Sequence, residues 1–291
     1  MSRHSATAIG LIAVLLWALL ALFTIGTDPV PPFQLNAMTF TLGGTIGLLW
    51  VAATNGWSRL RRVPLRVYLF GTLGLFGYHA LYFSALRLAP PAEASLIAYL
   101  WPLFIVLFSG LLPGERLGLY HVLGALIAFA GAALLIAPDG NGFTGGVGLI
   151  LAGLCALTWS SYSVLSRTAG AIPTESVAVF CVLTALLSVP LHLMLEVTQW
   201  PQDTTGWGAV LALGIGPVGL AFYVWDIGVK AGDIQLLGVA SYAAPLLSTL
   251  ILVLVGVAST SLTLLTAAAL ISGGAGLAAY GSALRQRNAP R

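Results

Sequence analysis

Long apolar stretches alternate with short polar segments along the whole chain. Each stretch continues for about 20 residues, the length that an α-helix needs to cross the hydrocarbon core of a bilayer. Strands of a transmembrane barrel would alternate in polarity instead, so helices are the preferred reading. The pattern predicts an all-α integral membrane protein with ten transmembrane helices near residues 6–26, 34–54, 67–87, 93–112, 118–137, 145–166, 175–195, 207–228, 234–256 and 262–283.

The composition agrees with a lipid environment. Hydrophobic residues make up 58% of the 291 residues and charged residues 7%, and the mean hydropathy is +0.97; in soluble domains about a quarter of the residues are charged. The spans leave no long soluble segment, so we expect neither an ATPase domain nor an ATPase partner. Cys155 and Cys181 lie inside apolar spans without metal-ligand spacing, and we expect no metal site and no cofactor.

The basic residues are distributed unevenly between the two sides that ten spans define. If the N-terminus is cytoplasmic, eleven of the twelve Lys and Arg residues fall on the inner side and only Arg87 falls outside. Cytoplasmic loops are enriched in Lys and Arg, so we expect both termini in the cytoplasm. The basic run from Arg59 to Arg66 then faces the lipid headgroups of the bilayer, and no nucleic-acid partner is expected.

The two halves of the chain repeat each other. An offset of 143 residues relates Tyr99 to Tyr242, Pro102 to Pro245, Arg87 to Lys230, Gly71 to Gly214 and Gly131 to Gly274. We expect two repeats of five helices, residues 1–138 and 145–285, joined by the loop from Pro138 to Gly146. Because five is odd, the second repeat enters the membrane inverted relative to the first, and inverted repeats provide a basis for alternating access.

A proline stands in the middle of the fourth and the ninth span. Proline inside a helix removes one hydrogen bond and leaves a carbonyl about one turn earlier unpaired, which lipid cannot satisfy. We therefore expect these spans to face a hydrated interior, with Pro102 and Pro245 as hinges. A packing kink without a ligand role is the alternative, but paired interruptions in the two halves are typical of transporter binding sites.

Two segments resemble a known membrane-protein repeat. The run Gly114-Glu115-Arg116-Leu117, followed by Gly124-Ala125-Leu126 and Gly131, resembles the EamA repeat of the drug/metabolite transporter superfamily. The segment from Gly148 to Arg167, with Trp159-Ser160-Ser161-Tyr162, resembles the start of a second copy. One departure is visible, because Gly256-Val257-Ala258-Ser259 stands where the repeat usually carries Gly-Glu.

The runs around the two prolines narrow the resemblance. Tyr99-Leu100-Trp101-Pro102 and Ser241-Tyr242-Ala243-Ala244-Pro245 resemble the aromatic amino acid exporters of that superfamily. This resemblance implies a small-molecule substrate, aromatic amino acids or similar amphipathic metabolites. It also implies a multi-pass protein of the bacterial inner (cytoplasmic) membrane.

Aromatic residues with polar tips are the candidates for contact with such a substrate. Tyr78 and Tyr82 share one helical face with His79 on its flank, whereas Trp50, Trp57, Trp200, Trp207, Tyr68 and Tyr120 fit an interfacial belt. Tyr82 and Trp225 lie near span ends and fit either role. The candidate substrate-binding residues are Trp17, Tyr78, His79, Tyr82, Tyr99, Trp101, Trp159, Trp225, Ser241 and Tyr242.

Few ionisable residues lie inside the spans. Asp226 and Lys230 are spaced i, i+4, which predicts a salt bridge that gates the cytoplasmic mouth. No carboxylate lies near the middle of a span, and His79 is the one plausible proton carrier. We therefore expect passive export, a uniport driven by the substrate gradient, with proton exchange as the alternative.

Three other functions are less compatible with the sequence. A drug or cation efflux protein would need a buried acidic residue, and none is central. An intramembrane enzyme would need a serine–histidine pair, paired aspartates or a zinc cluster, but the chain has neither HExxH nor GxSxG. A passive scaffold would not need repeated helix interruptions. We therefore expect a transporter and not an enzyme.

Overall fold

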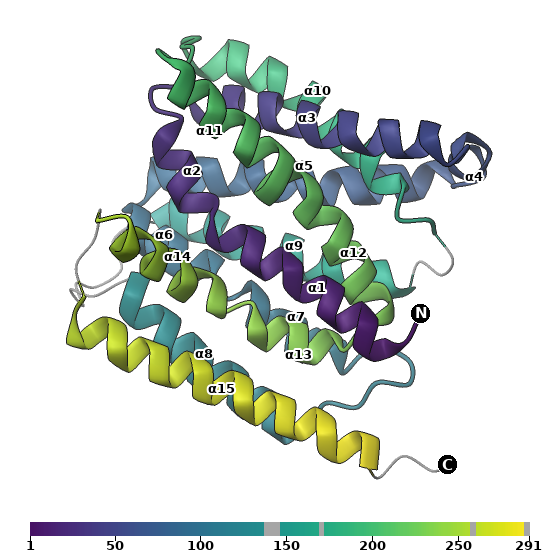
Figure 1. Ribbon diagram of the computed structural model, residues 1–291, viewed down its shortest axis with the longest axis vertical. Helices are drawn as coiled ribbons and strands as arrows, with labels where there is room; N and C mark the ends of the chain where they lie inside the picture. The colour runs from purple at the N-terminus through teal and green to yellow at the C-terminus, as the bar shows by residue number, and fades with distance from the viewer. Residues whose placement is uncertain (137–145, 169–171, 257–259, 288–291) are drawn as a thin grey trace.

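The computed structural model describes residues 1–136, 146–168, 172–256 and 260–287, and within these ranges every regular element is helical (Figure 1). The elements are α1 (Arg3–Ala18), α2 (Leu20–Gly26), α3 (Pro32–Ala53), α4 (Trp57–Arg61), α5 (Leu65–Leu88), α6 (Pro91–Ala98), α7 (Trp101–Ser109), α8 (Leu119–Ile136), α9 (Gly146–Thr168), α10 (Ser176–Leu195), α11 (Thr204–Ile215), η1 (Gly216–Leu220), α12 (Ala221–Ala231), α13 (Ile234–Ala240), α14 (Ala243–Leu254) and α15 (Leu262–Arg287). The predicted all-α class is confirmed for the described residues.

Eight helical segments of the described chain are long and apolar enough to cross a membrane. They correspond to the first, second, third, sixth, seventh, eighth, ninth and tenth predicted spans. Two shorter apolar helices, Glu93–Ser109 and Leu119–Leu135, correspond to the fourth and fifth. The predicted linker falls on residues 137–145, and Val257, Ala258, Ser259 and Arg291 also lie outside the described residues.

The fourth and ninth spans are broken rather than kinked. The first breaks at Tyr99 and Leu100, between α6 and α7, and the other breaks between α13 and α14. Pro102 is the second residue of α7 and Pro245 the third of α14. The prolines thus occupy the first turn of a new helix, where amide groups have no intrahelical acceptor and a missing N–H costs little.

Small residues bring two helices of the described fold into direct contact. A Cβ added to Gly124 of α8 would lie 2.5 Å from the carbonyl oxygen of Gly274 in α15, and one added to Gly131 would lie 2.9 Å from that of Ala267. The backbones therefore touch, as small residues allow in membrane bundles. The small residues of α8 and α15 serve packing within the chain.

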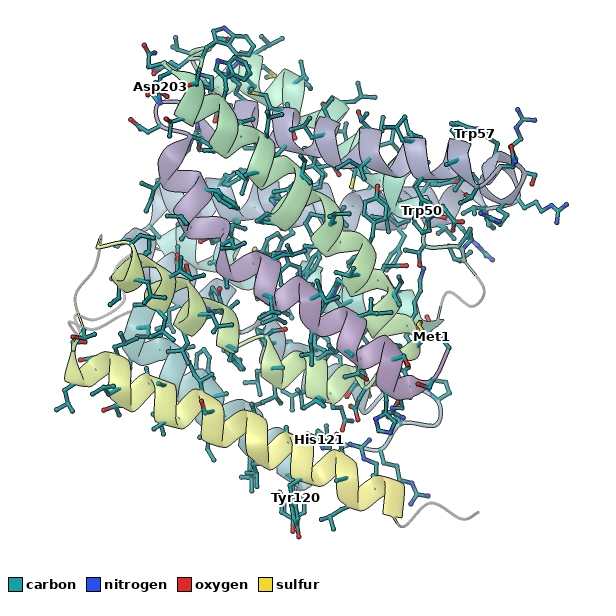
Figure 2. The ribbon with its side chains drawn as sticks, viewed as in Figure 1. Met1, Trp50, Trp57, Tyr120, His121 and Asp203 are labelled. Atoms are coloured by element: carbon teal, nitrogen blue, oxygen red, sulfur yellow. The ribbon has the colours of Figure 1, made fainter. Side chains whose placement is uncertain are left out.

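The two ends of the bundle carry different charges. The start of α1 and the end of α15 lie at the same end, together with α4 (Figure 1). Arg3, Arg167 and Arg285 meet there around Glu115. Arg87 lies at the opposite end, where it pairs with Glu196 at 2.8 Å. Figure 2 labels Met1 at the first end and Asp203 at the other.

Candidate functional site

Four tryptophans from four helices meet in the middle of the bundle. They are Trp17 of α1, Trp101 of α7, Trp159 of α9 and Trp225 of α12. The Trp17 ring centroid lies 6.0 Å from that of Trp101, 5.9 Å from that of Trp159 and 5.1 Å from that of Trp225. Trp101 and Trp159 each lie within 6.4 Å of Trp225. We call these four residues the tryptophan cluster.

The exposure of the cluster is uneven. Trp225, Trp159 and Trp101 are 1%, 3% and 6% exposed, whereas Trp17 is only partly buried. The Trp225 indole donates its N–H to the Ser163 hydroxyl at 3.1 Å. The burial of Trp225 rules out the interfacial-belt alternative for this residue. Trp50 and Trp57, by contrast, lie at the periphery (Figure 2) and are well exposed.

Further aromatic residues of α5 extend the tryptophan cluster. Tyr78 lies 5.5 Å from Trp159 and stacks on Tyr82 with centroids 6.0 Å apart. The Tyr82 hydroxyl lies 3.1 Å from the Ser95 hydroxyl of α6. All these rings are partly exposed, unlike the three buried tryptophans. Tyr78 and Tyr82 therefore offer aromatic surface as well as polar groups beside the cluster.

His79 packs among aromatic rings. Its ring centroid is 4.9 Å from that of Phe40 and 6.1 Å from that of Phe222. Its Nδ1 lies 2.7 Å from the Leu75 carbonyl oxygen, and because a carbonyl can only accept, Nδ1 carries a proton. In the neutral imidazole Nε2 is then the acceptor.

The remaining candidates lie at the helix breaks. Tyr242 is fully buried, and its hydroxyl accepts a hydrogen bond from the Leu103 amide at 3.1 Å. Tyr99 and Tyr242 belong to a second apolar cluster with Phe129 of α8. The Ser241 hydroxyl donates to the Leu237 carbonyl at 2.8 Å. The predicted set therefore divides into three groups. Four residues form the tryptophan cluster, three residues of α5 lie beside it (Tyr78, His79 and Tyr82), and three lie at the breaks (Tyr99, Ser241 and Tyr242).

The predicted pair of Asp226 and Lys230 forms a salt bridge of 2.8 Å. Asp226 is buried and also accepts a hydrogen bond from the Thr174 hydroxyl at 2.7 Å. The Lys230 ammonium donates a second bond to the Ile172 carbonyl at 3.1 Å. The pair thus connects α12 to the segment before α10, and both charges have partners.

A larger charged network lies at the end of the bundle that carries the start of α1, and the sequence did not predict it. Glu115 lies in the loop between α7 and α8 with its side chain 5% exposed. Its carboxylate is 2.8 Å from Arg167, 3.2 Å from Arg3 and 3.3 Å from Arg285. One carboxylate therefore connects α1, α9 and α15. The arginines are 52 to 170 residues away in sequence, so no local spacing indicates the contact.

Asp233, at the start of α13, extends this network. The Ser282 hydroxyl donates to Asp233 at 2.8 Å, so Nε2 of His121, 3.0 Å away, donates to Ser282 in turn. Burial alone raises the pKa of Asp233. Hydrogen bonds from the Leu236 amide and the Ser282 hydroxyl, with the Arg3 cation, outweigh that effect and lower this pKa below its ordinary value.

The opposite end is held by Glu196, whose side chain is 1% exposed. It accepts hydrogen bonds from the amides of Phe33 and Gln34 at 2.9 and 3.0 Å, at the start of α3. Nδ1 of His192 lies 3.0 Å away and Arg87 2.8 Å away. A carboxylate is well placed at a helix N-terminus because free amides and the helix dipole favour negative charge. Glu196 thus joins α3, α5 and α10.

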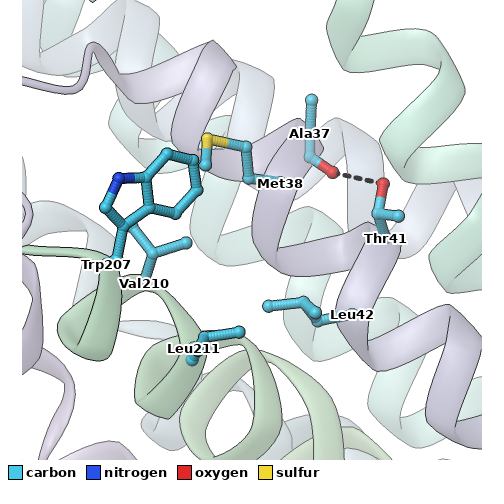
Figure 3. A pocket seen from close by; sticks show the side chains of 7 residues that line it. All are labelled: Ala37, Met38, Thr41, Leu42, Trp207, Val210 and Leu211. Atoms are coloured by element: carbon cyan, nitrogen blue, oxygen red, sulfur yellow. Dashed lines mark hydrogen bonds between the residues drawn. The ribbon is translucent and has the colours of Figure 1, made fainter. Parts of the chain in front are cut away.

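An apolar groove lies apart from these residues, between α3 and α11 (Figure 3). Its volume is about 360 Å³, and its lining is Ala37, Met38, Thr41, Leu42, Trp207, Val210 and Leu211. The Thr41 hydroxyl donates to the Ala37 carbonyl at 2.7 Å, so this lining hydroxyl has an acceptor within its own helix. Trp207 and Leu211 are exposed, and the groove fits contact with lipid chains better than a polar solute.

The family model and the named relatives of this chain all indicate a membrane transporter. The model of the EamA-like transporter family matches the chain twice, over residues 4–137 and 146–280. A protein of Ancylobacter novellus named aromatic amino acid exporter YddG is 55% identical over 282 residues, which cover 96% of this chain and 98% of the relative. A protein of Escherichia coli with the same name is 26% identical over 291 residues, covering 94% of this chain and 96% of the relative.

A solved crystal structure is similar over its whole length. It is 54% identical, covers 99% of this chain and 100% of its own, and superimposes with a TM-score of 0.93. The family match, together with the eight segments of the described chain that are long and apolar enough to cross a membrane, makes this a multi-pass membrane protein with a transport role. The chain belongs to the EamA-like transporter family.

Proposed function

We propose that this chain exports aromatic amino acids and similar small amphipathic metabolites, by alternating access and without coupling to an ion gradient. The observation that carries the proposal is the tryptophan cluster, where rings from α1, α7, α9 and α12 meet beside the partly exposed Tyr78 and Tyr82. Aromatic faces bind aromatic rings, and the tyrosine hydroxyls supply polar contacts for an amino acid backbone. The name of the 55% identical relative points to the same substrates.

The proposal includes ten membrane spans arranged as two inverted repeats, residues 1–138 and 145–285. Packing between α8 and α15 supports this arrangement. The contact of Gly124 with Gly274 becomes the contact of Gly131 with Ala267 when each residue is replaced by its counterpart 143 residues away. The same exchange converts the contact of α1 with α12 into that of α5 with α9, and both pairs pack extensively.

The breaks at Tyr99 and Tyr242 are the proposed hinges, with Pro102 and Pro245 starting the second half of each span. Gly238 of α13 supports a common pivot, because a Cβ there would lie 3.1 Å from the Pro102 carbonyl oxygen. The backbones of the two broken spans therefore approach each other near the middle. Asp226 and Lys230 form the proposed gate at the cytoplasmic mouth.

Orientation and location complete the proposal. The basic end, with Arg3, Arg167 and Arg285, faces the cytoplasm of a bacterium according to the positive-inside rule, and both termini lie there. Substrate leaves across the inner membrane towards the end that carries Arg87 and Glu196.

Proton-coupled efflux of drugs or metabolites is the second candidate. His79 favours it, because this titratable ring lies between Phe40 and Phe222, next to the tryptophan cluster. Its side chain could exchange a proton with a bound substrate.

Uptake into liposomes distinguishes the candidates. Purified protein is reconstituted, and uptake of labelled tryptophan, phenylalanine and threonine is followed with and without an imposed pH gradient. The proposal expects aromatic-selective flux that stops at equal concentrations and ignores the pH gradient. Accumulation driven by the pH gradient would establish the proton exchanger, and His79→Gln should then abolish accumulation while leaving equilibration. Equal flux of threonine and tryptophan would refute aromatic selectivity.

A further inference from the structure

The eighth span contains a widened turn that its counterpart lacks. Between α11 and α12, residues Gly216–Leu220 form a π-helical turn with Pro217 as its second residue. Proline cannot donate to the carbonyl four residues earlier and its ring collides with that carbonyl, so widening the turn relieves the conflict. The corresponding residues 143 positions earlier, 73–77, lie in the uninterrupted helix α5 and include no proline.

The π turn presents a carbonyl to the tryptophan cluster. The Trp17 indole donates its N–H to the carbonyl oxygen of Pro217 at 3.1 Å. An indole has one hydrogen-bond donor and no acceptor, so this bond uses the whole polar capacity of Trp17. The ring is left with apolar and π contacts only.

The turn itself is held in place by glycines. A Cβ on Gly219 would collide with the Gly214 carbonyl, and a Cβ on Gly43 of α3 would lie 2.9 Å from the Gly219 Cα. The π turn therefore rests directly on the backbone of α3. A carbonyl in such a position is a fixed acceptor.

Trp17 is also the most exposed member of the tryptophan cluster. Its ring contacts those of Trp101, Trp159 and Trp225, yet it remains partly exposed while the other three are buried. It is the next-to-last residue of α1, which ends at Ala18. The ring contacts hold the indole among its neighbours, and the hydrogen bond to Pro217 fixes the direction of its N–H group.

We infer that Pro217 is a positioning residue for substrate selection: its carbonyl orients Trp17 and leaves it only a ring face for the substrate. This inference deepens the proposed function and rests on it. The selected ligand class is a planar aromatic ring, bound by stacking and without a hydrogen bond from Trp17. An aliphatic side chain of similar size gains less from an oriented ring, so loss of the orientation reduces discrimination between the two.

The test is a double-mutant cycle on reconstituted protein. Pro217→Ala removes the cause of the π turn, and Trp17→Phe keeps a ring but removes the donor. KM and kcat are measured for phenylalanine and for leucine in wild type, both single variants and the double variant. Pro190→Ala is the matched control, since Pro190 is an exposed proline inside the intact helix α10.

Each single variant should raise the KM for phenylalanine about fivefold, the effect of one lost hydrogen bond, with kcat within about twofold. The KM for leucine should stay within about twofold. The double variant should equal the single variants, because both remove the same bond. Pro190→Ala should match wild type.

Independent, multiplicative effects in the cycle would overturn the inference, as would equal increases in KM for phenylalanine and leucine. If Pro217→Ala fails to fold, Trp17→Phe decides alone, and a wild-type KM for phenylalanine in that variant overturns it. These failures differ from failure of the proposed function, in which the wild-type protein itself would not prefer aromatic amino acids.

Discussion

Tyr242→Phe tests whether the two broken spans act as one unit. In the structure the Tyr242 hydroxyl accepts a hydrogen bond from the Leu103 amide at 3.1 Å. Leu103 is the third residue of α7, so its amide has no intrahelical acceptor and the hydroxyl caps the helix. Loss of such a cap costs about 1–2 kcal/mol, and here the site is fully buried.

The same free energy applies to the balance between conformations if the bond exists in only one of them. A change of about 1–2 kcal/mol alters a population ratio about 5- to 30-fold. The counterpart residues, Tyr99 and Leu246, would make the equivalent bond in the opposite conformation if the repeats exchange roles. Tyr242→Phe and Tyr99→Phe should therefore shift the balance in opposite directions.

The assay is the rate at which a thiol reagent added from outside labels a cysteine introduced at Phe83, in a background with both native cysteines replaced by alanine. Phe83 is partly exposed and contacts His79 and Tyr82. The two tyrosine variants should change the labelling rate in opposite directions, each by about 5- to 30-fold. Tyr280→Phe, on an exposed ring of α15, is the control. Equal labelling in both variants, with a lower melting temperature for Tyr242→Phe alone, would refute the exchange and leave only a structural cap.

Three other changes test separate parts of the structure. Glu115→Gln removes the charge of the common acceptor of Arg3, Arg167 and Arg285. Because the arginines are partly exposed, the free energy of unfolding should fall by only roughly 1–3 kcal/mol. The fall is measured as a lower melting temperature in detergent, and an unchanged melting temperature would show that the network is energetically neutral. Gly274→Ala should lower the free energy of unfolding by about 1–3 kcal/mol, because the added methyl group overpacks against Gly124. Gly273→Ala is the control and should match wild type, because a Cβ added there meets nothing within 4 Å. Equal effects of the two substitutions would exclude close packing as the cause. The pKa of Asp233 is lowered in the folded state. Its contribution to stability is therefore present above its unfolded pKa of about 3.9 and is lost as the pH falls below that value. Asp233→Asn should reduce the fall in melting temperature between pH 6 and pH 3, and an unchanged fall would assign the acid sensitivity to other groups.

Continuous apolar runs were sufficient to predict the helical class, because length and polarity alone determine what a bilayer accepts. Trp17, Trp101 and Trp159 were expected to contact the substrate, but nothing in the sequence indicated that their rings lie within 6.3 Å of one another. The role of Trp225 stayed open because this residue lies near the end of its predicted span. The π turn at Gly216–Leu220, which shifts the helical phase before Trp225, is not visible in the sequence pattern. The prolines indicated interrupted spans, but the breaks at Tyr99 and Ser241 precede them, because proline is tolerated where a helix starts.

Contacts between distant residues were beyond any single-sequence pattern. Glu115 was visible only as part of a family signature, and nothing in its spacing indicated three arginines. Nothing in the sequence around His121 indicates a partner, yet Ser282 and Arg285, more than 160 residues away, lie 3.0 Å from its ring nitrogens. Such contacts depend on which helix ends come together, and helical periodicity carries no information about that.

The charged residues make the two ends of the transporter inequivalent. At the basic end Glu115 joins three helices through arginines, while the matching run of the second repeat has Val257 after Gly256 in place of an acidic residue. At the other end Glu196 binds Arg87, His192 and the start of α3. Under the proposed alternating access, opening the basic end would separate Glu115 from its three arginines, and this cost biases the populations towards the conformation that is closed at that end. This bias alters the populations of the two states but does not drive net export, because a carrier without an energy source equalises concentrations whatever its resting state. Glu115→Gln should therefore change the exchange rate and leave the final substrate distribution unchanged.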